Sequence, residues 1–288
     1  MIPGLEGQGG WGWPALSGVV LLMLFGTPCA AQWAEEPGRG WISGSVHHHD
    51  TRTAFDMHGA RYDFVLDGRA VSTSGYLTAA AGLVTGIDAW AQLSFHRFRF
   101  DDSAARRVST GPGDARLYLR ANPLHWIGEP LPFALRAGVK LPVGDLDVGS
   151  SLLPLGDGQT DYELLVEAGR SFHPKPLYLM GWVGHRWRAA NRETGRSFGD
   201  EWFYFVQVGG TLGVMEYKLI LEGLRGDGAG TSGGPAYGPR RELAVVNPSL
   251  GVSLGPGAVE LGLRVPVAGK NLPAGHAWTA GYFMRWGS

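Results

Sequence analysis

The feature that most constrains this chain is an alternation of apolar and polar residues that recurs in segment after segment from about residue 70 onward. In the segment 133–141 every second residue is apolar, and Arg136 and Lys140 lie between the apolar ones. The segment 161–171 repeats the scheme with Glu163 and Glu167 on its polar side. Side chains of a β-strand point alternately to its two faces. The pattern therefore predicts an all-β fold whose strands have one apolar and one polar face.

The predicted strands are numerous and long. Twelve of them fall at 41–50, 72–84, 89–100, 114–122, 132–141, 160–171, 177–188, 201–212, 215–225, 241–253, 258–266 and 276–286. Strands of soluble sheets usually have about 5 or 6 residues, whereas a tilted strand needs about 9 to 11 residues to cross a bilayer. Most of the predicted strands reach that length, which favours strands that span a membrane.

The connections between these strands alternate in length. Short turns rich in turn-forming residues are predicted at 85–88, 174–175, 213–214 and 254–257, with a longer one at 123–131. Longer polar links are predicted at 51–71, 101–113, 142–159, 189–200, 226–240 and 267–275. This layout predicts a single antiparallel transmembrane β-barrel of about 12 strands with short periplasmic turns and long extracellular loops. A soluble β-sandwich is the alternative, since its strands alternate as well.

The first residues have the pattern of an export signal. Residues 15–25 form an apolar run, and small residues follow it up to Ala31. Cys29 and Ala31 suit the −3 and −1 positions of a signal-peptidase site before Gln32. We therefore expect 1–31 to be a cleaved signal peptide and 32–288 to form a barrel in the outer membrane of a Gram-negative bacterium.

The charge balance narrows the choice of partners. The chain has 25 Lys and Arg and 26 Asp and Glu, and removal of 1–31 takes away only Glu6, which leaves the two signs equal. A balanced chain argues against nucleic acid as a partner. Charged residues make up 18% of the chain, below the roughly 25% of soluble domains. This low fraction agrees with a surface that partly faces outer-membrane lipid.

In a barrel of this kind the polar faces of the strands turn inward. The charged residues on those faces are the candidates for lining the lumen, namely Arg116, Arg120, Arg136, Lys140, Asp161, Glu163, Glu167, Arg186, Arg188, Glu216, Lys218, Glu222, Glu260 and Arg264. Acidic and basic candidates lie on neighbouring strands, so pairing is the simplest expectation for any one of them. Twelve tilted strands enclose a backbone cylinder of roughly 24 Å, which leaves a bore for small solutes only.

The sequence 47–50, His-His-His-Asp, is the most suggestive group for metal binding or catalysis. Alternation sends His48 to the face opposite His47 and His49, so at most two of them share a metal ion. No Lys is followed by Ser or Thr, as a phosphate-binding loop would require. We therefore expect no metal, no cofactor and no catalytic residues. A hydrolase whose residues meet only in the folded chain remains an alternative, because catalytic triads are recognised by geometry.

Aromatic residues mark the ends of several predicted strands. The last strand, from Thr279 to Trp286, resembles the C-terminal signal that outer-membrane proteins present to the barrel-assembly machinery, which is therefore an expected partner. Trp and Tyr near strand ends are candidates for aromatic girdles at the two membrane interfaces, and the alternative for some of them is a buried core aromatic. The candidates are Trp41, Trp90, Tyr178, Trp182, Trp187, Trp202, Tyr204, Trp278 and Trp286.

Four short motifs carry a resemblance to a known family. They are Gly-Asp-Ala-Arg-Leu-Tyr-Leu-Arg at 113–120, Gly-Val-Lys-Leu-Pro-Val-Gly at 138–144, Leu-Gly-Asp-Gly-Gln-Thr-Asp at 155–161 and Gly-Trp-Val-Gly-His-Arg-Trp-Arg at 181–188. In this order they resemble the MetA-pathway of phenol degradation family over about residues 110–225. The resemblance implies an outer-membrane β-barrel that is linked, by the family's name, to uptake of aromatic or other hydrophobic compounds. It implies no catalytic residues.

Three functions agree with these observations. The first, which we favour, is an outer-membrane channel or facilitator for small solutes of aromatic or other hydrophobic character. The second is a barrel enzyme, a lipid or peptide hydrolase, which requires a nucleophile and a base within hydrogen-bonding reach near the external rim. The third is a structural barrel whose long loops bind partners.

Overall fold

The computed structural model describes residues 34–128, 132–144, 153–191, 199–227 and 240–287, so the expected signal peptide, 1–31, lies outside the described residues. The strands are β1 Gly40–Thr51, β2 Thr53–Phe55, β3 Arg61–Asp63, β4 Arg69–Val84, β5 Ile87–Asp101, β6 Arg106–Pro112, β7 Ala115–Ala121, β8 Phe133–Leu141, β9 Asp161–Ser171, β10 Leu177–Arg188, β11 Glu201–Leu212, β12 Met215–Gly226, β13 Glu242–Leu254, β14 Gly257–Lys270 and β15 Ala277–Trp286. Two short 3-10 turns, η1 Val65–Asp67 and η2 His125–Ile127, complete the described elements. All twelve predicted strands are confirmed, with ends displaced by a few residues.

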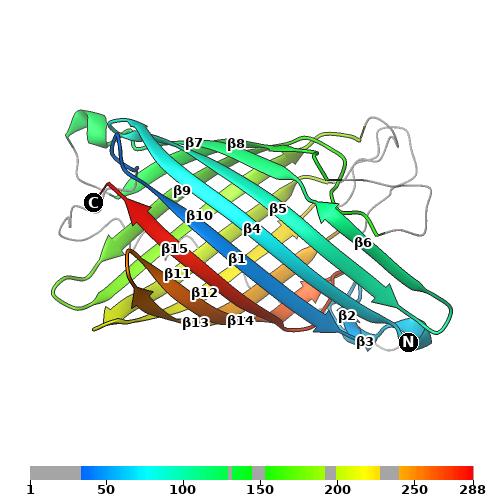
Figure 1. Ribbon diagram of the computed structural model, residues 1–288. Coiled ribbons are helices and arrows are strands. Elements are labelled where there is room, and N and C mark those ends of the chain that lie inside the picture. Colours follow the sequence, from blue (N-terminus) through cyan, green and yellow to red (C-terminus); the bar gives the residue numbers. More distant parts are fainter. Residues whose placement is uncertain (1–33, 129–131, 145–152, 192–198, 228–239, 288) are drawn as a thin grey trace, which may run out of the picture.

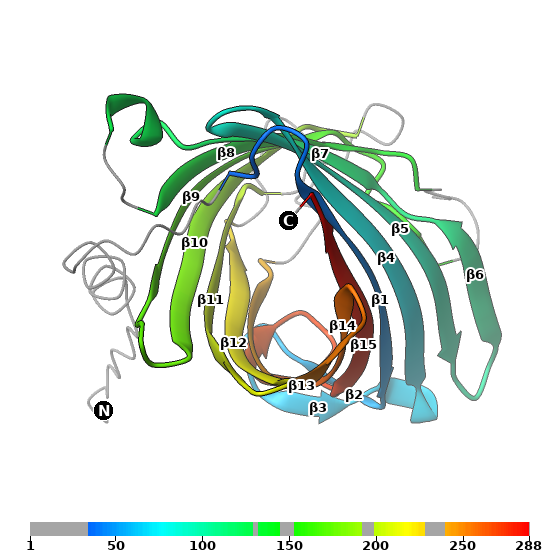
Figure 2. The ribbon, with the colours of Figure 1, turned by 60° about the vertical axis from the view of Figure 1, so that its left-hand side comes forward.

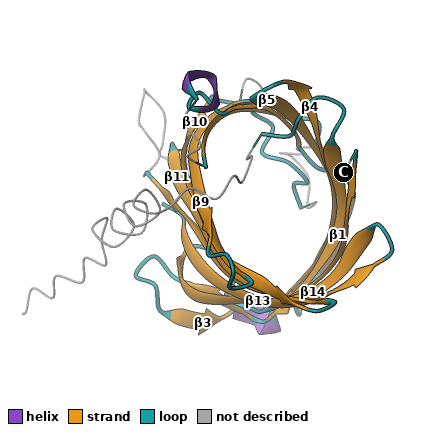
Figure 3. Cartoon of the chain, turned by 90° about the vertical axis from the view of Figure 1, so that its left-hand side faces the viewer, coloured by secondary structure: helices purple, strands orange, loops and turns teal. Residues whose placement is uncertain are grey.

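All described strands except β2 and β3 form one closed antiparallel wall (Figure 1). Each strand pairs with its neighbour in the chain from β7 to β15, and β1 pairs with β15 on one side and β4 on the other. The pairings β4–β5 and β5–β7 close the ring, which has 12 strands around its circumference. Figure 3 shows this ring along its axis. The predicted single barrel of about 12 strands is therefore confirmed.

The strand β6 was not predicted and lies within the segment 101–113 that we expected to be a loop. Both β6 and β7 pair with β5, one with each half of it, so together they occupy a single position in the wall. Figure 2 shows β6 beside β5 where the wall extends furthest. Pro112 and Gly113 interrupt the alternation between β6 and β7, because both residues are unfavourable inside a strand. Because of this interruption, the alternation in the sequence did not indicate β6.

The short and long connections gather at opposite ends of the barrel, as predicted. The tight turns place Gly86, Gly213 and Gly255 at φ values of +81°, +62° and +59°, a region that glycine enters without steric cost. Gly40 of β1 lies opposite Trp286 of β15, so the first and last strands meet at the same end as these turns. We call this end the short-turn end and the other end the long-loop end.

The segment 51–71 contains the small hairpin β2–β3, which no periodicity indicated. The hairpin packs against the upper end of β14, where β15 does not reach. Ala54 pairs with Pro273, and the Arg61 guanidinium donates to the carbonyl oxygen of Pro266 at 2.7 Å. Figure 3 shows β3 beyond the wall near β13. The hairpin therefore covers an exposed strand edge at the long-loop end.

The two faces of the wall differ in chemistry. Large aliphatic side chains such as Leu93, Leu117 and Leu261 are exposed, the last at 63%. Residues on the other face are polar and either buried or half-buried, as with Asp161, which is 0% exposed beside Tyr162 at 58%. Since the wall is closed, the apolar exposed face is its outside and the polar face is its inside. The sandwich alternative is wrong, because in a sandwich the aliphatic rows would be buried between two sheets.

Tyrosine side chains lie across glycines on neighbouring strands at several points of the wall. A Cβ atom at Gly138 would overlap the Tyr118 ring inside the barrel, and one at Gly223 would lie 2.6 Å from the Tyr204 hydroxyl outside it. Such cross-strand pairs fill the space that glycine leaves and fix the register of the strands. Separately, no helix among the described residues is long and apolar enough to cross a membrane.

Candidate functional site

The barrel interior holds the densest group of charged side chains, beginning with Lys140 on β8. Its Nζ atom lies 3.2 Å from Asp114, 2.7 Å from Asp157 and 2.8 Å from Asp161, and the side chain is only 2% exposed. A buried ammonium is tolerated only when it is paired. Here three carboxylates surround a single Lys, so further cations must balance them.

Two arginines on β10, and Arg241 just before β13, supply that balance. Arg188 of β10 contacts Asp157 at 2.7 Å and Glu201 of β11 at 3.2 Å. Arg186 joins Glu163 at 2.7 Å to Glu201 at 2.8 Å, and Arg241 reaches Glu201 at 2.5 Å. These ion pairs run across β8 to β11 near the long-loop end. We call this set, together with Lys140 and its three carboxylates, the rim network.

The segment 153–160 folds against the inner face of the wall and is tied to the rim network. Asp157 provides the main link, and its backbone N–H also donates to the Asp114 carboxylate at 3.2 Å. The N–H of Leu153 donates to the Ser109 hydroxyl at 2.8 Å, and Leu155 is buried beside Gly111. This part of the link between β8 and β9 therefore occupies interior space instead of extending away from the barrel.

The pKa of Asp157, which lies outside the strands, is set by these contacts. Burial raises it, but the charges of Lys140 and Arg188 outweigh burial and lower the pKa from 3.8 to about 2. The carboxylate therefore stays ionised over the whole neutral and mildly acidic range.

A second group of ion pairs lies nearer the short-turn end. Arg120 contacts Asp88 at 2.5 Å and Glu167 at 3.6 Å, and Arg136 contacts Glu167 at 2.7 Å. Asp88 also accepts a hydrogen bond from the backbone N–H of Glu35 at 2.8 Å. The group holds two cations and two anions, so it carries no net charge when all four are ionised.

Aromatic rings surround this second group. The Arg136 guanidinium lies over the rings of Trp90, Tyr118 and Trp182, at 4.5, 5.0 and 5.8 Å from their centroids. Trp41 packs edge-on against Trp90 with centroids 4.8 Å apart. These rings are half-buried, so part of each ring surface remains accessible from the interior. We call them, together with Phe205 and Phe283, the aromatic belt.

Only some of the aromatic residues predicted for the interfacial girdles lie on the outer face. Trp187, Trp202, Trp278 and Trp286 are exposed on the outside, as a girdle requires, and Tyr204 also lies on the outer face. Trp41, Trp90, Trp182 and Tyr178 belong to the interior instead. The prediction for these four was wrong because apolar neighbours on both sides, as around Trp41, leave the face of an aromatic residue undecided in the sequence.

The remaining wall is less tightly packed. On β12 to β14, Lys218 pairs with Glu260 and lies 3.8 Å from Glu216, while Arg264 pairs with Glu222 at 2.5 Å. Lys218 is 23% exposed, far more than Lys140. The inner face of β1, β4 and the middle of β5 carries uncharged groups instead, including Ser43, Ser45, Tyr76, Thr78 and Gln92. The interior thus has one densely charged side and one hydroxyl-rich side.

All fourteen residues that the sequence analysis assigned to the polar face take part in ion pairs. Those on β7 to β10 meet in the rim network and beside the aromatic belt, whereas those on β12 and β14 form separate pairs. Sequence reasoning missed Asp88, Asp114, Asp157, Glu201 and Arg241. Asp114 and Asp157 had a signal, since both lie in the motifs quoted above, but their turn-like surroundings suggested only a backbone role.

The histidines at 47–49 divide between the two faces. His48 is exposed and contacts the Thr73 hydroxyl at 3.0 Å, whereas His49 contacts the carbonyl oxygen of Gly275 at 3.1 Å and His47 packs beside Tyr76. Within the described ranges no three His, Cys, Asp or Glu side chains are arranged to hold a metal ion.

One contact bears on the hydrolase alternative. Ser74 Oγ lies 2.8 Å from His96 Nδ1 on the neighbouring strand. The two residues are 7% and 9% exposed, so both are enclosed in the inner face of the wall. A nucleophile must reach its substrate, and this burial favours a structural hydrogen bond between β4 and β5.

Comparison with known proteins supports the fold. No family model and no curated protein matches the chain. Among solved structures, the COG4313 outer membrane channel from Pseudomonas putida F1 is similar with a TM-score of 0.70 at 16% identity, over 91% of this chain and 100% of that one. The β domain of the Bordetella autotransporter BrkA has a TM-score of 0.52 at 10% identity, over 85% and 98%. Both are barrels, and at these identities the likeness concerns the fold.

Proposed function

We propose that this protein is a channel for small solutes in the outer membrane of a Gram-negative bacterium. The observation that carries the proposal is the closed ring of 12 strands with aliphatic side chains outside and ion-paired side chains inside. This arrangement is stable where hydrocarbon contacts the outer face. The similar structure from Pseudomonas putida, described as an outer membrane channel, supports the same function. Outer-membrane lipid is then the partner of the outer face.

The fourteen charged residues are proposed to line the solute path. Those of the rim network, with the inner segment 153–160, narrow the path at the long-loop end, because Asp157 is fixed by Lys140 and Arg188. The half-buried pairs of β12 to β14 line the opposite part of the path. A path with charged groups on one side and hydroxyl groups on the other remains hydrated and passes solutes smaller than the bore.

Aromatic compounds are the proposed solute class. The aromatic belt presents half-buried ring surfaces to the interior, and the Arg136 guanidinium lies among them. Aromatic solutes gain from stacking on such rings, and a phenolic hydroxyl finds hydrogen-bonding partners on the hydroxyl-rich side of the path. This agrees with the family resemblance of the four motifs.

Two measurements test this function. Protein purified from membranes is expected to give discrete conductance steps in a planar bilayer. If no conductance is measured, the proposal of a channel is wrong. Relative to protein-free liposomes, which phenol enters by itself, liposomes that contain the protein are expected to speed the entry of phenol more than that of a neutral pentose of larger size. Substitution of Trp182 by Ala is expected to reduce the preference for phenol, while Trp278→Ala, on the outer face, serves as the matched control.

The placement in the outer membrane is tested separately. An outer-membrane barrel that keeps its fold in detergent migrates differently in a gel before and after heating, and the protein is expected to do so when extracted from outer-membrane fractions. Export by residues 1–31 and recognition of β15, through Thr279 to Trp286, by the assembly machinery are part of the proposal. Removal of the Trp286 side chain is expected to lower the amount of assembled barrel.

A further inference from the structure

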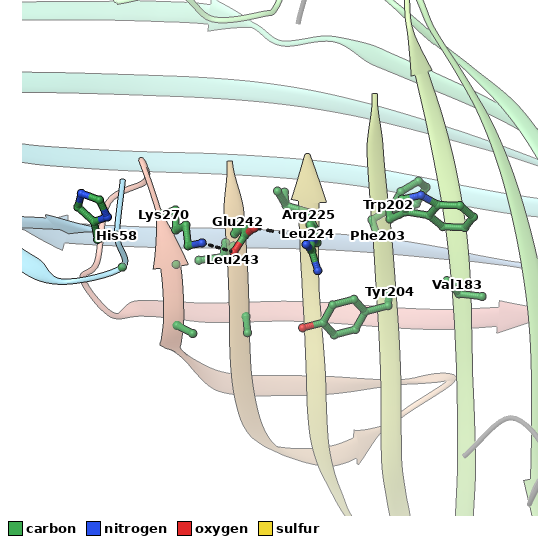
Figure 4. A pocket seen from close by; sticks show the side chains of 14 residues that line it. His58, Val183, Trp202, Phe203, Tyr204, Leu224, Arg225, Glu242, Leu243 and Lys270 are labelled. Atoms are coloured by element: carbon green, nitrogen blue, oxygen red, sulfur yellow. Dashed lines mark ion pairs between the residues drawn. The ribbon is translucent and has the colours of Figure 1, made fainter. Parts of the chain in front are cut away.

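The outer wall carries a groove that the channel function does not use. It lies over β10 to β14 near the long-loop end and has a volume of about 480 Å3. Val183, Trp202, Tyr204, Arg225, Glu242 and Lys270 line it (Figure 4). His58, from the turn of the β2–β3 hairpin, closes one end. The six strand residues named above belong to outward-facing positions, so the groove opens away from the lumen.

The part of the groove nearest the long-loop end is lined by a row of mostly charged side chains. Trp202, Arg225, Glu242 and Lys270 lie directly opposite one another on four successive strands. Glu242 is the shared anion, at 3.7 Å from Arg225 and 3.2 Å from Lys270. Arg240 approaches it too, at 2.8 Å. Three cations therefore share a single carboxylate, and each cation is at least one-third exposed, so the row remains positively charged.

The lower part of the groove is apolar and shallow. In the next outward row Tyr204 lies opposite Gly223, which lies opposite Ala244, which lies opposite Ala268. Tyr204 lies over Gly223, and beside it the small side chains of Ala244 and Ala268 leave a trough in the outer wall. Figure 4 shows Tyr204 lying across β12, below the charged row, with Val183 beyond it.

The positions of the charged row and the apolar trough along the barrel indicate the class of ligand. Positive charge lies toward the long-loop end and the apolar trough lies toward the middle of the barrel, as in an amphiphile whose headgroup is at the membrane surface. Arginine guanidinium groups bind phosphate oxygens with directed hydrogen bonds. We propose that this groove binds a phosphorylated glycolipid of the outer leaflet, with a phosphate on Arg225, Arg240 and Lys270 and an acyl chain in the trough of Ala244 and Ala268, beside the Tyr204 ring. This inference rests on the proposed membrane placement and orientation but not on solute passage.

Delipidated full-length protein in detergent provides the test. The probe is a bisphosphorylated, acylated glucosamine disaccharide lipid, and binding is measured by native mass spectrometry and by the shift in melting temperature. The double variant Arg225→Gln with Lys270→Gln is expected to weaken binding by about tenfold or more. Ala244→Leu, which fills the trough without changing charge, is expected to do the same.

The control is a pair of cations on the outer surface elsewhere, Arg97→Gln with Arg106→Gln, on β5 and β6. It is expected to change binding by no more than about twofold. Only variants that keep the heat-dependent gel shift of the wild type are compared.

Three results would overturn the glycolipid site. They are unchanged binding in both groove variants, equal binding of the same lipid without its phosphates, and equal binding of phosphatidylglycerol. Conductance measurements distinguish failure of the glycolipid proposal from failure of the channel proposal. If the wild type conducts but binds no glycolipid, only the glycolipid proposal is wrong. If the wild-type protein is absent from outer membranes, both proposals are wrong.

Discussion

Lys140 shows what a single residue contributes inside this barrel. Its ammonium group is held by three carboxylates from three different segments, Asp114, Asp157 and Asp161. Only one of the three lies on a neighbouring strand; Asp114 precedes β7 and Asp157 belongs to the inner segment 153–160. The residue therefore joins the wall to the segment that narrows the path, and its loss would leave buried carboxylates without a close cation.

Replacement of Lys140 by Met is expected to lower the free energy of unfolding by about 3–5 kcal/mol, because removing one partner leaves uncompensated buried charge. The measurement is urea unfolding of the refolded protein in lipid vesicles. Lys218→Met is the control, since its ion pairs are partly exposed and contribute about 0–1 kcal/mol. Equal losses for the two variants would show that burial does not distinguish them.

Asp157 gives stability a predictable dependence on acid. Its folded pKa, about 2, lies below the ordinary value of 3.8, mainly through Lys140 and Arg188, which outweigh the opposing effect of burial. A carboxylate with a lowered pKa contributes stability above its unfolded pKa and loses that contribution as pH falls through the folded pKa. The contribution is therefore complete above about pH 4 and lost toward pH 2.

Asp157→Asn is expected to have a lower melting temperature than the wild type at pH 6, and the difference is expected to shrink as the pH falls from about 4 to 2. Thermal scans across this range measure it. Asp63→Asn, at an exposed position of the hairpin, should show no such convergence. A difference that stays constant with pH would mean that the charge of Asp157 does not hold the inner segment.

At the scale of the strand, the contacts between tyrosine and glycine determine how neighbours fit together. Tyr118 on β7 occupies the space above Gly138 on β8, and Tyr204 does the same over Gly223 on the outer face. The same device serves different purposes on the two faces. Inside, it brings the Tyr118 hydroxyl to Glu163 at 2.6 Å and its ring under Arg136; outside, it shapes the groove.

Gly138→Ala is expected to destabilise the barrel by about 1–3 kcal/mol, because the new methyl group overlaps the Tyr118 ring and forces it to move. Unfolding in urea measures the effect. Gly44→Ala is the control, since a Cβ there meets nothing within 4 Å. The double variant with Tyr118→Ala should recover part of the loss, and a loss that is simply additive would rule out the steric cause.

The strands were predictable from sequence because period-two alternation reports a wall with two unlike faces, and it did so from β4 to β15. It failed where that contrast fades. The three-residue strands β2 and β3 are too short to show a period, and Pro112 with Gly113 breaks β6 from β7. For the charged residues of the interior, strand alternation predicted which face each side chain occupies, but it did not predict which residues each one pairs with. Asp157 and Glu201 both contact Arg188, because the connection before β9 folds inward and β11 lies next to β10.

At the scale of the whole molecule, the outer and inner faces should respond oppositely to the same substitution. Val46 and Ser45 are neighbours on β1, with Val46 exposed outside and Ser45 inside opposite Tyr76. Val46→Lys is expected to destabilise the barrel in lipid by about 2–4 kcal/mol, as charges near the bilayer midplane do. Ser45→Lys is expected to change stability by far less and to alter ion selectivity, read from reversal potentials in a planar bilayer. If Ser45→Lys destabilised the barrel more than Val46→Lys, the inner face and not the outer face would be the one that contacts hydrocarbon.

The pairing of β1 with β15 also governs how such a wall is completed. Every other contact in the ring joins strands that are close in the chain, but this one brings Gly40 to Trp286. Contacts between residues far apart in sequence form late, because a long stretch of chain must first be ordered. We therefore expect the sheet to grow from neighbouring hairpins with two unpaired edges, and the joining of these edges to be the slow step of its folding kinetics.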